Sequence, residues 1–389
     1  MELKREYEMV LLGATGFTGQ LCVEYVTVHF PTNFRWAVAG RSESKLSSIV
    51  ADAKKLNPDR LQPDVLVVPL EKEELNDLAT KSIVIINCVG PYHIYSTPVV
   101  EACAENGTHY LDFTGETVWV EEMIRKYDET ARKSGAMIIT SVAVESAPSD
   151  LLAYTLYKHV SPASPKTIEA CIHTLAPRPS GGTIATMLTT NRDYSNEELI
   201  PSNPPLPEHK MHKNPHLGYL YPSMMSMPNV HTVTRSVNLI PSVYPPNLVY
   251  KEYARASNPI SQVLTYVSMT VGMIILGLLP PLRTLLLKVI PSPGTGPQGV
   301  EKDVLETRAV AYNSDGKAVG FGKFYWKGGL YPLTAMLGCE AAMTILRGKS
   351  EPVSKIRSGF LTPASLGDEF VEKVGIAGGA LDIKKERMW

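Results

Sequence analysis

The first candidate functional segment is glycine-rich and directly follows an apolar run near the start of the chain. Residues 9–12 are apolar and are expected to form a strand, after which glycine recurs at every third position. Such a turn lets backbone N–H groups approach a diphosphate at the N-terminus of the next helix, where the helix dipole favours negative charge. The segment therefore predicts a dinucleotide site. Its predicted contacts come from Gly13, Thr15, Gly16, Phe17, Thr18 and Gly19.

Polar residues follow the second predicted strand, residues 36–40, where the adenosine ribose of a bound dinucleotide would lie. The first is Arg41, and Ser42 and Lys45 lie just behind it. A carboxylate would accept bonds from a ribose hydroxyl, whereas a guanidinium binds a 2′-phosphate, so Arg41 favours NADP over NAD. The alternative is that the glycines mark only a tight turn and Arg41 only a solvated corner.

A third group of candidate residues follows the apolar run 83–86. The reacting end of a dinucleotide lies at the carboxyl ends of the strands in a doubly wound sheet, so the turn after this run is expected to line it. Glycine and proline there would let the backbone pass close to the nicotinamide ribose. The residues expected to contact the cofactor here are Asn87, Cys88, Val89, Gly90 and Pro91.

Hydride addition to an activated C=C bond leaves an enolate that needs a proton or a donor hydrogen bond. We rank Tyr92 first for this role, the alternative being that it packs or contacts the ribose. His93 is interpreted as a satisfied histidine at the surface or in a cleft, and Glu116 as a residue that stabilises a turn or helix start. An iminium acceptor would need no strong acid, because it carries its own positive charge. The candidate donors are Tyr92, Tyr95, His93 and Glu145.

Composition and charge narrow the function classes. The chain has 389 residues, of which 44% are apolar, enough for two cores. The formal net charge of −1 argues against a nucleic-acid partner. Five cysteines without a Cys-x-x-Cys spacing favour a reducing compartment, so we expect the cytoplasm. The charged first residues lack the apolar run of a cleavable signal peptide.

The order of predicted elements indicates two kinds of domain. Strands and helices alternate over the first 150 residues or so, whereas alternating strands such as 168–173 and 304–311 follow later. We predict an α/β fold, a Rossmann-type doubly wound parallel sheet with an inserted α+β substrate domain. The predicted divisions are 1–164 for the dinucleotide-binding domain, 165–328 for the substrate domain, and 329–389 for a C-terminal helical return onto the first domain.

An apolar segment, residues 256–290, is unusual because residues 256–282 contain no charge. A helix over 263–279 would be about 25 Å long, a little short of the roughly 30 Å hydrocarbon layer. Three interpretations stay open: a monotopic hairpin or interfacial helix, burial against the protein or a partner subunit, and a true span. An apolar helix beside a cofactor site would suit a lipophilic substrate.

Residues 200–228 are rich in proline, asparagine, histidine and methionine and are expected to form a long loop of the kind that often acts as a lid. His209, His212 and His216 lie in it. A metal site usually needs a fixed scaffold and a carboxylate or cysteine partner, so we interpret these histidines as part of a solvated loop and expect no metal.

Seven short segments spread over most of the chain form a characteristic set. They are residues 13–19, 39–42, 87–92, 109–116, 180–183, 294–299 and 359–364. With these segments the chain resembles the saccharopine dehydrogenase-like oxidoreductase family, including its trans-acting enoyl reductase branch. The resemblance implies a Rossmann domain interrupted by a substrate domain. It also implies reduction of C=C or C=N bonds with a nicotinamide, in some members on lipids or secondary metabolites.

One segment departs from the family pattern. Where the family usually shows Gly-Phe-Asp-Ser before Pro-Ser-Asp, this chain has Ala143-Val144-Glu145-Ser146. The added methyl and methylene groups alter the pocket wall near the nicotinamide. The usual substrate therefore need not carry over, whereas the reaction class does.

The resulting prediction is an NADPH-dependent reductase that transfers a hydride to an activated C=C bond of an apolar or lipid-like metabolite. One alternative is imine reduction of the saccharopine dehydrogenase type, which would need cationic side chains gripping carboxylates. A second is a non-catalytic NADP-binding protein on a membrane or lipid droplet, anchored through 256–290, and a homodimer is also left open. The cationic candidates for carboxylate binding are Arg178, Arg192, Arg235, Arg255 and Arg308.

Overall fold

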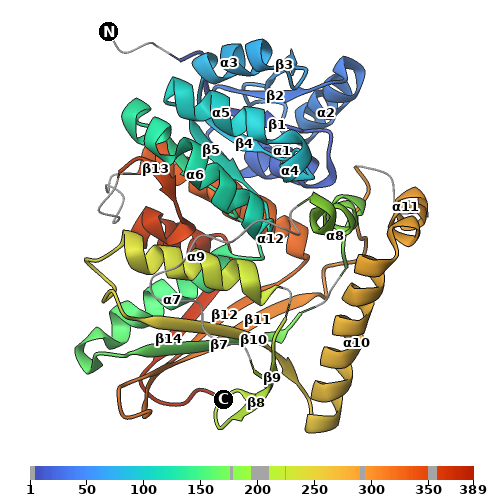
Figure 1. Ribbon diagram of the computed structural model, residues 1–389. Helices are drawn as coiled ribbons and strands as arrows, with labels where there is room; N and C mark the ends of the chain where they lie inside the picture. The colour runs from blue at the N-terminus through green and yellow to red at the C-terminus, as the bar shows by residue number, and fades with distance from the viewer. Residues whose placement is uncertain (1–4, 176–177, 194–209, 224, 290–293, 349–356) are drawn as a thin grey trace.

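The computed structural model describes residues 5–175, 178–193, 210–223, 225–289, 294–348 and 357–389. Two seven-stranded sheets lie one above the other in the view of Figure 1, with helices packed around and between them. The largest core cluster is continuous across both, because it contains Leu11 of the upper sheet, Phe324 of the lower sheet, and Leu151 and Leu337 from helices between them.

The upper sheet is parallel throughout, in the order β13-β6-β5-β4-β1-β2-β3. Helices cover both faces of such a sheet, which is why its inner strands are almost continuously apolar. The expected Rossmann-type sheet is confirmed. Its strands are β1 (Tyr7–Leu12), β2 (Trp36–Gly40), β3 (Asp64–Val67), β4 (Ser82–Asn87), β5 (His109–Asp112), β6 (Met137–Ile139) and β13 (Gly359–Leu361).

The helices of this half form two layers, with α1 against α12 on one side and α5 between α3 and α6 on the other. Ser96 is the residue before α5, and the Thr97 hydroxyl accepts a hydrogen bond from the Trp119 indole at 3.0 Å. The helices are α1 (Phe17–His29), α2 (Glu43–Leu56), α3 (Lys72–Lys81), α4 (Tyr92–Tyr95), α5 (Thr97–Asn106), α6 (Thr117–Ser134) and α12 (Leu330–Arg347).

The lower sheet is mixed, in the order β14-β12-β11-β7-β10-β9-β8. Helices α7 (Ala147–Val160) and α9 (Ser226–Leu239) pack against it. Its strands are β7 (Thr167–Thr174), β8 (His212–Asn214), β9 (Gly218–Tyr221), β10 (Val249–Ala256), β11 (Val304–Tyr312), β12 (Ala318–Lys327) and β14 (Ala380–Lys384).

The C-terminal part of the chain departs from the expected helical return. The helix α12 packs on α1 as expected, and β13 extends the upper sheet beside β6. However, β14 extends the lower sheet beside β12, and α13 (Gly367–Ile376) connects the two strands. Residues 329–389 therefore contribute a strand to each sheet. The proposed divisions at residues 164 and 328 stay predictions.

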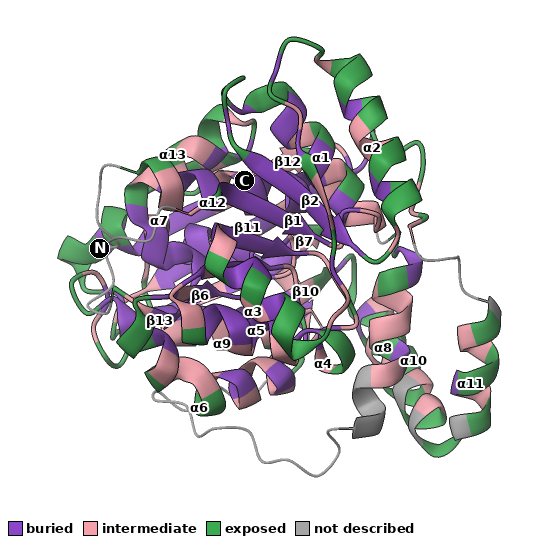
Figure 2. Ribbon diagram, turned by 90° about the horizontal axis from the view of Figure 1, so that it is seen from above, coloured by how far each residue is buried: buried purple, intermediate pink, exposed green. Residues whose placement is uncertain are grey.

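The apolar segment forms two helices, α10 (Pro259–Leu278) and α11 (Pro280–Val289), at the edge of the molecule (Figure 2). Among the described residues, α10 is the one helix long and apolar enough to cross a membrane. Its window Pro259–Leu276 has a mean hydropathy of 1.5, and only 6% of it is buried. This window of α10 is therefore not buried against its own chain. Burial against a partner subunit, a monotopic or interfacial helix and a true span stay predictions.

Part of the long loop expected at 200–228 forms regular structure. Strands β8 and β9 form a hairpin within it, and residues 200–209, including His209, lie outside the described part. His212 lies 2.8 Å from the Glu169 carboxylate, and the His216 ring packs edge-on against Phe321. The described residues contain no group of three or more potential metal-binding side chains.

Candidate active site

The turn between β1 and α1 has the geometry that a diphosphate requires. Gly13 has a positive φ of +82°, and a Cβ there would lie 2.8 Å from Cγ2 of Val89. A Cβ at Gly19 would overlap the Gly13 carbonyl oxygen, so the first turn of α1 packs directly on the backbone of the glycine-rich turn. Helix α1 starts at Phe17 without a side-chain cap, which leaves its first N–H groups for a ligand. The residues of the turn therefore fit a dinucleotide diphosphate.

Arg41 is exposed immediately after β2, on the edge where β1 and β2 both end. Lys45 is also exposed, and the Ser42 hydroxyl lies 3.3 Å from that of Ser44. The structure thus places a guanidinium beside the predicted ribose position, as a 2′-phosphate would need. The roles of Arg41, Ser42 and Lys45 in binding stay predictions.

Asn87 organises the turn after β4 from beneath. Its amide nitrogen donates to Ser96 Oγ at 2.8 Å and Tyr110 Oη at 3.0 Å, and its oxygen accepts from the Val89 N–H at 3.1 Å. Because the Asn87 side chain already makes these three hydrogen bonds, we expect the cofactor to contact the backbone of the turn after β4. Cys88, Val89, Gly90 and Pro91 form that backbone, next to the turn containing Gly13.

Glu116 holds the start of α4. Its carboxylate accepts from the backbone N–H groups of Tyr92 at 2.9 Å and His93 at 2.8 Å, and lies 2.6 Å from His93 Nδ1. The His93 and Glu116 side chains are each only 1% exposed. The interpretation of Glu116 as a helix-start residue therefore agrees with the structure. His93 lies in the interior as a partner of this carboxylate, not at the surface.

The Tyr92 hydroxyl points inward. It donates to the Asn87 carbonyl at 3.4 Å, its ring packs near Trp119, and burial raises the pKa of Tyr92 well above its usual value. This geometry favours the alternative packing role over proton donation. Tyr95 is 41% exposed at the end of the same short helix.

Glu145 is the candidate donor that the geometry favours. It follows β6, and a Cβ at Gly115 would lie 3.9 Å from Glu145 Cγ, so Glu145 lies against the turn after β5. Burial raises the pKa of Glu145 above its ordinary value. A carboxyl group that holds its proton more tightly can serve as a general acid near neutral pH.

Asp112, at the end of β5, was not among the candidate residues. Its carboxylate accepts from the N–H groups of Ser141 at 2.8 Å and Thr114 at 3.1 Å, and from the Tyr110 hydroxyl at 2.9 Å. Burial raises the pKa of Asp112 to about 7. This residue ties the ends of β5 and β6 together. The signal that could have found it was an acidic residue in the last position of a buried strand.

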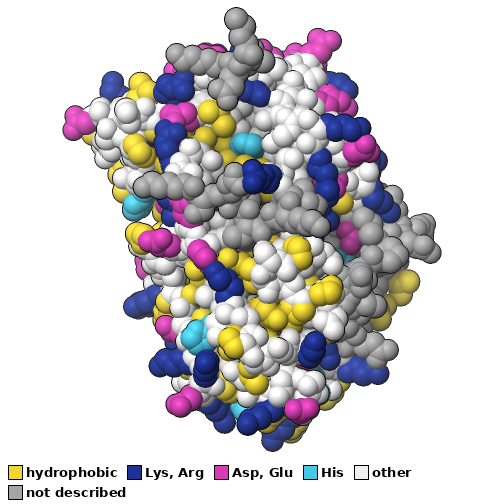
Figure 3. Space-filling view, turned by 90° about the vertical axis from the view of Figure 1, so that its left-hand side faces the viewer, with side chains coloured by type: hydrophobic (Ala, Val, Ile, Leu, Met, Phe, Trp, Pro, Cys, Tyr) yellow, Lys and Arg dark blue, Asp and Glu magenta, His cyan; other side chains and the backbone are white. Residues whose placement is uncertain are grey.

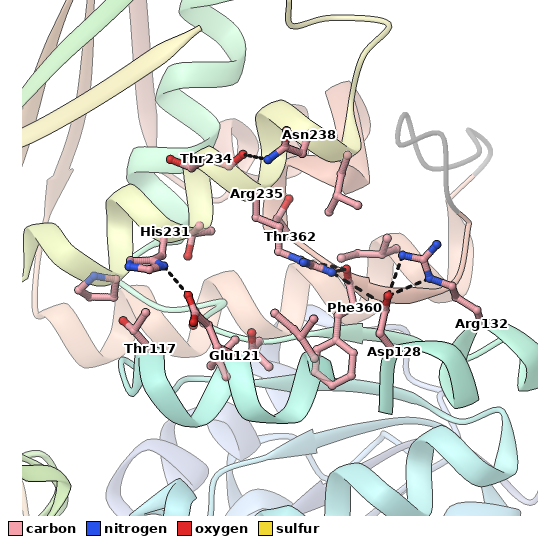
Figure 4. A pocket seen from close by; sticks show the side chains of 18 residues that line it. Thr117, Glu121, Asp128, Arg132, His231, Thr234, Arg235, Asn238, Phe360 and Thr362 are labelled. Atoms are coloured by element: carbon pink, nitrogen blue, oxygen red, sulfur yellow. Dashed lines mark hydrogen bonds and ion pairs between the residues drawn. The ribbon is translucent and has the colours of Figure 1, made fainter. Parts of the chain in front are cut away.

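A cavity of about 360 Å³ lies between α6 and α9 and reaches Thr140 and Ser141 at the end of β6 (Figure 4). We call it the α6–α9 cavity. Its charged groups are paired: Glu121 lies 2.9 Å from His231 Nδ1, and Asp128 lies 2.7 Å from Arg132 Nη2. The Arg235 guanidinium donates to the Phe360 carbonyl at 2.7 Å. The cavity therefore adjoins the candidate site, and its acidic side chains are paired with basic ones.

Comparison with known proteins decides the family. Residues 9–139 match the saccharopine dehydrogenase NADP binding domain. The trans-acting enoyl reductase of Mycobacterium ulcerans is 30% identical over 415 aligned residues, which cover 96% of this chain and 97% of that protein. The chain belongs to the saccharopine dehydrogenase-like oxidoreductase family. The resemblance to its trans-acting enoyl reductase branch is confirmed.

Two further comparisons bear on location and fold. The lipid droplet localized protein of Caenorhabditis elegans is 38% identical over 148 residues, covering 37% of this chain and 35% of that protein. Apo saccharopine dehydrogenase (L-Glu forming) from Saccharomyces cerevisiae superposes with a TM-score of 0.58 at 12% identity, covering 97% of this chain and 99% of that one. The second comparison shows the fold alone.

The protein is therefore an NADP-dependent oxidoreductase. Bound NADP supplies or accepts the hydride, and the protein supplies orientation and proton handling. The turn containing Gly13 and Gly16 would hold the diphosphate and Arg41 the 2′-phosphate. Tyr92, Tyr95, His93 and Glu145 stay predictions as catalytic residues.

Proposed function

We propose that this oxidoreductase uses NADPH to reduce an activated C=C bond in an apolar, lipid-like metabolite. The observation that carries the choice against imine reduction is that three of the five candidate arginines bind groups of the protein itself. The Arg192 side chain lies outside the described part, and Arg255 is exposed. Arg178 lies 3.3 Å from Asp303, Arg308 lies 2.5 Å from Glu306, and Arg235 donates to a carbonyl. A carboxylate-bearing imine would require such groups to be directed at substrate. The enoyl reductase name of the Mycobacterium ulcerans relative supports the same choice.

In this proposal the hydride adds to the carbon distal to the activating carbonyl, and the resulting enolate takes a proton at the neighbouring carbon. We assign that proton to Glu145, because its side chain lies against the turn after β5 and burial raises its pKa above the ordinary value. The α6–α9 cavity, which adjoins this edge, would accept part of the substrate.

The test is NADPH consumption by the purified full chain across matched panels of apolar enones and cyclic imines. We expect loss of NADPH absorbance with enones. Consumption with imines alone would replace the proposal by imine reduction, and NADPH binding without consumption in either panel would favour the non-catalytic alternative. The Glu145→Gln variant should retain NADPH binding while enone reduction falls by about 10²-fold or more.

We also propose that the substrate reaches the protein from a lipid surface that α10 contacts. Leu264 and Leu278 are 67% and 75% exposed, and the large apolar side chains that α10 exposes follow helical spacing along one face. They belong to residues 260, 263, 264, 267, 271, 274, 275 and 278. A capping box at Asn258 and a bond from the Gln262 amide to the His212 carbonyl at 3.1 Å fix its first turn. By contrast, the face turned away from α10 carries charges of both signs (Figure 3). The Caenorhabditis elegans relative is named for its location on lipid droplets, which supports this proposal.

Flotation with phosphatidylcholine vesicles tests the lipid contact. We expect the wild-type chain to float, a Leu264→Glu/Val271→Glu/Leu278→Glu variant to stay in the dense fraction, and a matched Ile376→Glu variant to float, since Ile376 is 80% exposed on a different helix. If the wild type does not float and elutes as a dimer that the triple variant disrupts, α10 is a homodimer interface. In that case the cytoplasmic location would hold without a lipid contact.

A further inference from the structure

Two segments distant in sequence meet at Phe17, the first residue of α1. A Cβ on Gly296 would overlap the Phe17 ring, and a Cβ on Gly294 would lie 3.2 Å from the Thr15 carbonyl oxygen. The backbone around Gly294 and Gly296 therefore rests directly on the first turn of α1. This close approach requires glycine at position 296, and the positive φ of +91° favours glycine at position 294.

Tyr331, near the start of α12, is the second partner of Phe17. The two rings meet edge to face, with centroids 5.1 Å apart and planes at 72°. The Tyr331 hydroxyl accepts from the Ser180 N–H at 2.6 Å and lies 2.7 Å from Thr183 Oγ1. Tyr331 thus joins the predicted dinucleotide turn to the start of α8 (Gly181–Asp193).

Arg178 links the residues before α8 to the segment after Gly296. Its guanidinium donates to the Gln298 carbonyl at 3.1 Å and lies 3.3 Å from the Asp303 carboxylate. The chain entering α8 is consequently tied to the segment that follows Gly296. Residues 178–183, 294–299 and Tyr331 form one connected unit, which contacts the first domain through Phe17 and Thr15.

We propose that Tyr331 is a positioning residue that couples NADP binding at the Phe17 turn to the placement of α8 and residues 294–299. The backbone N–H groups of this turn are the predicted diphosphate donors, so a bound cofactor restrains the base of the Phe17 ring. The Phe17 ring transmits this restraint to Tyr331 and to Gly296. The Tyr331 hydroxyl transmits it onward to α8. The inference rests on the proposed function, since α8 belongs to the part of the chain proposed to hold substrate.

Hydrogen exchange of the full chain with and without NADPH tests this coupling. In the wild type we expect NADPH to slow exchange at residues 13–20, 181–189 and 294–300. Tyr331→Phe keeps the ring contact with Phe17 but loses the hydroxyl, so protection at 181–189 should fall by about threefold or more while that at 13–20 and 294–300 persists. The Kd for NADPH should stay within about threefold of wild type. Tyr219→Phe, a hydroxyl deletion on β9, is the matched control and should behave as wild type.

A second variant tests the other contact. Gly296→Ala places a methyl group in the space of the Phe17 ring, so NADPH should no longer protect residues 294–300. Protection confined to 13–20 in the wild type overturns the coupling while leaving NADPH binding intact. Loss of the 181–189 protection in Tyr219→Phe as well would also overturn it. Absence of NADPH binding would instead overturn the proposed function itself.

Discussion

At the scale of single residues, selectivity for the phosphorylated cofactor depends on Arg41. This residue is exposed directly after β2, so its guanidinium is accessible to a bound nucleotide. We expect Arg41→Ala to weaken NADPH binding by about 1–3 kcal/mol and to leave NADH binding almost unchanged. Calorimetric titration with both nucleotides measures the difference. Lys54→Ala, which removes an exposed charge at the far end of α2, should affect neither, and equal losses for both nucleotides would exclude Arg41 from the 2′-phosphate site.

A second residue-scale prediction separates Tyr92 from Glu145. Because the Tyr92 hydroxyl donates to the Asn87 carbonyl, Tyr92→Phe should change the NADPH Kd and the rate of enone reduction by about threefold or less. Single-turnover measurements of NADPH oxidation provide the comparison with Glu145→Gln. A large rate loss in Tyr92→Phe, with unchanged NADPH affinity, would restore Tyr92 as the proton donor.

These residues also show what the sequence could and could not predict. The turn containing Gly13 and Gly16 was predictable because glycine spacing and strand context reflect local backbone geometry. The inward direction of Tyr92 and the burial of His93 were not predictable. The Tyr92 ring packs near Trp119 and His93 pairs with Glu116, and both partners lie more than twenty residues away in the sequence. The role of Asp112 was likewise not predictable, because it depends on a hydrogen bond from Ser141, which follows the neighbouring strand β6.

At the scale of elements, Asp128 fastens β13 to α6. Its carboxylate accepts from the Phe360 N–H at 2.7 Å and pairs with Arg132, and the side chain is 20% exposed. We expect Asp128→Ala to lower the free energy of unfolding by about 1–3 kcal/mol, because a backbone donor and a guanidinium lose their partner. Chemical denaturation measures the loss. Asp52→Ala breaks an exposed pair with Lys55 and should cost about 0.5 kcal/mol or less, so equal losses would contradict this role.

Long apolar helices were predictable in kind and approximate extent. The helix expected over 263–279 corresponds to α10, and the helical return expected from residue 329 begins with α12. The short strands β8, β13 and β14 were not predicted as parts of particular sheets. Each has three to five residues. The strands β13 and β14 pair with strands far away in the chain, whereas β8 pairs with β9 in a hairpin at the edge of the lower sheet. Sequence periodicity carries no information about such partners.

At the scale of the whole molecule, buried carboxyl groups near the helices that join the sheets predict a pH-dependent stability. Burial raises the pKa of Asp150 and Glu252 to about 7, as it does for Asp112. Asp150 on α7 accepts from Ser236 Oγ at 2.6 Å and the Ala364 N–H at 2.8 Å. Folded pKa values above the unfolded ones mean that the folded state binds more protons, so stability falls as the pH rises towards and through 7.

We expect the free energy of unfolding to fall between pH 6 and pH 8 by about 1 kcal/mol for each of these carboxyl groups. Burial lowers the pKa of His109 and His173 to about 4, so each raises the free energy of unfolding by about 1 kcal/mol or slightly less between pH 6 and pH 8 and offsets part of this decline. Denaturation of the wild type and of an Asp150→Asn/Glu252→Gln variant at both pH values checks the expectation. The variant should show a shallower decline, and an equal decline in both proteins would assign the effect to other groups.

The division of the chain's last strands between the two sheets has a consequence for biosynthesis. The strands β13 and β14 each form an edge of their sheet, and both come from residues 359–384. Before these residues leave the ribosome, β6 and β12 each expose an unpaired row of backbone groups to other nascent chains. Both sheets are thus expected to be completed only once residues 359–384 have left the ribosome, and a stop codon shortly after α12 should produce aggregates in place of a shorter folded enzyme.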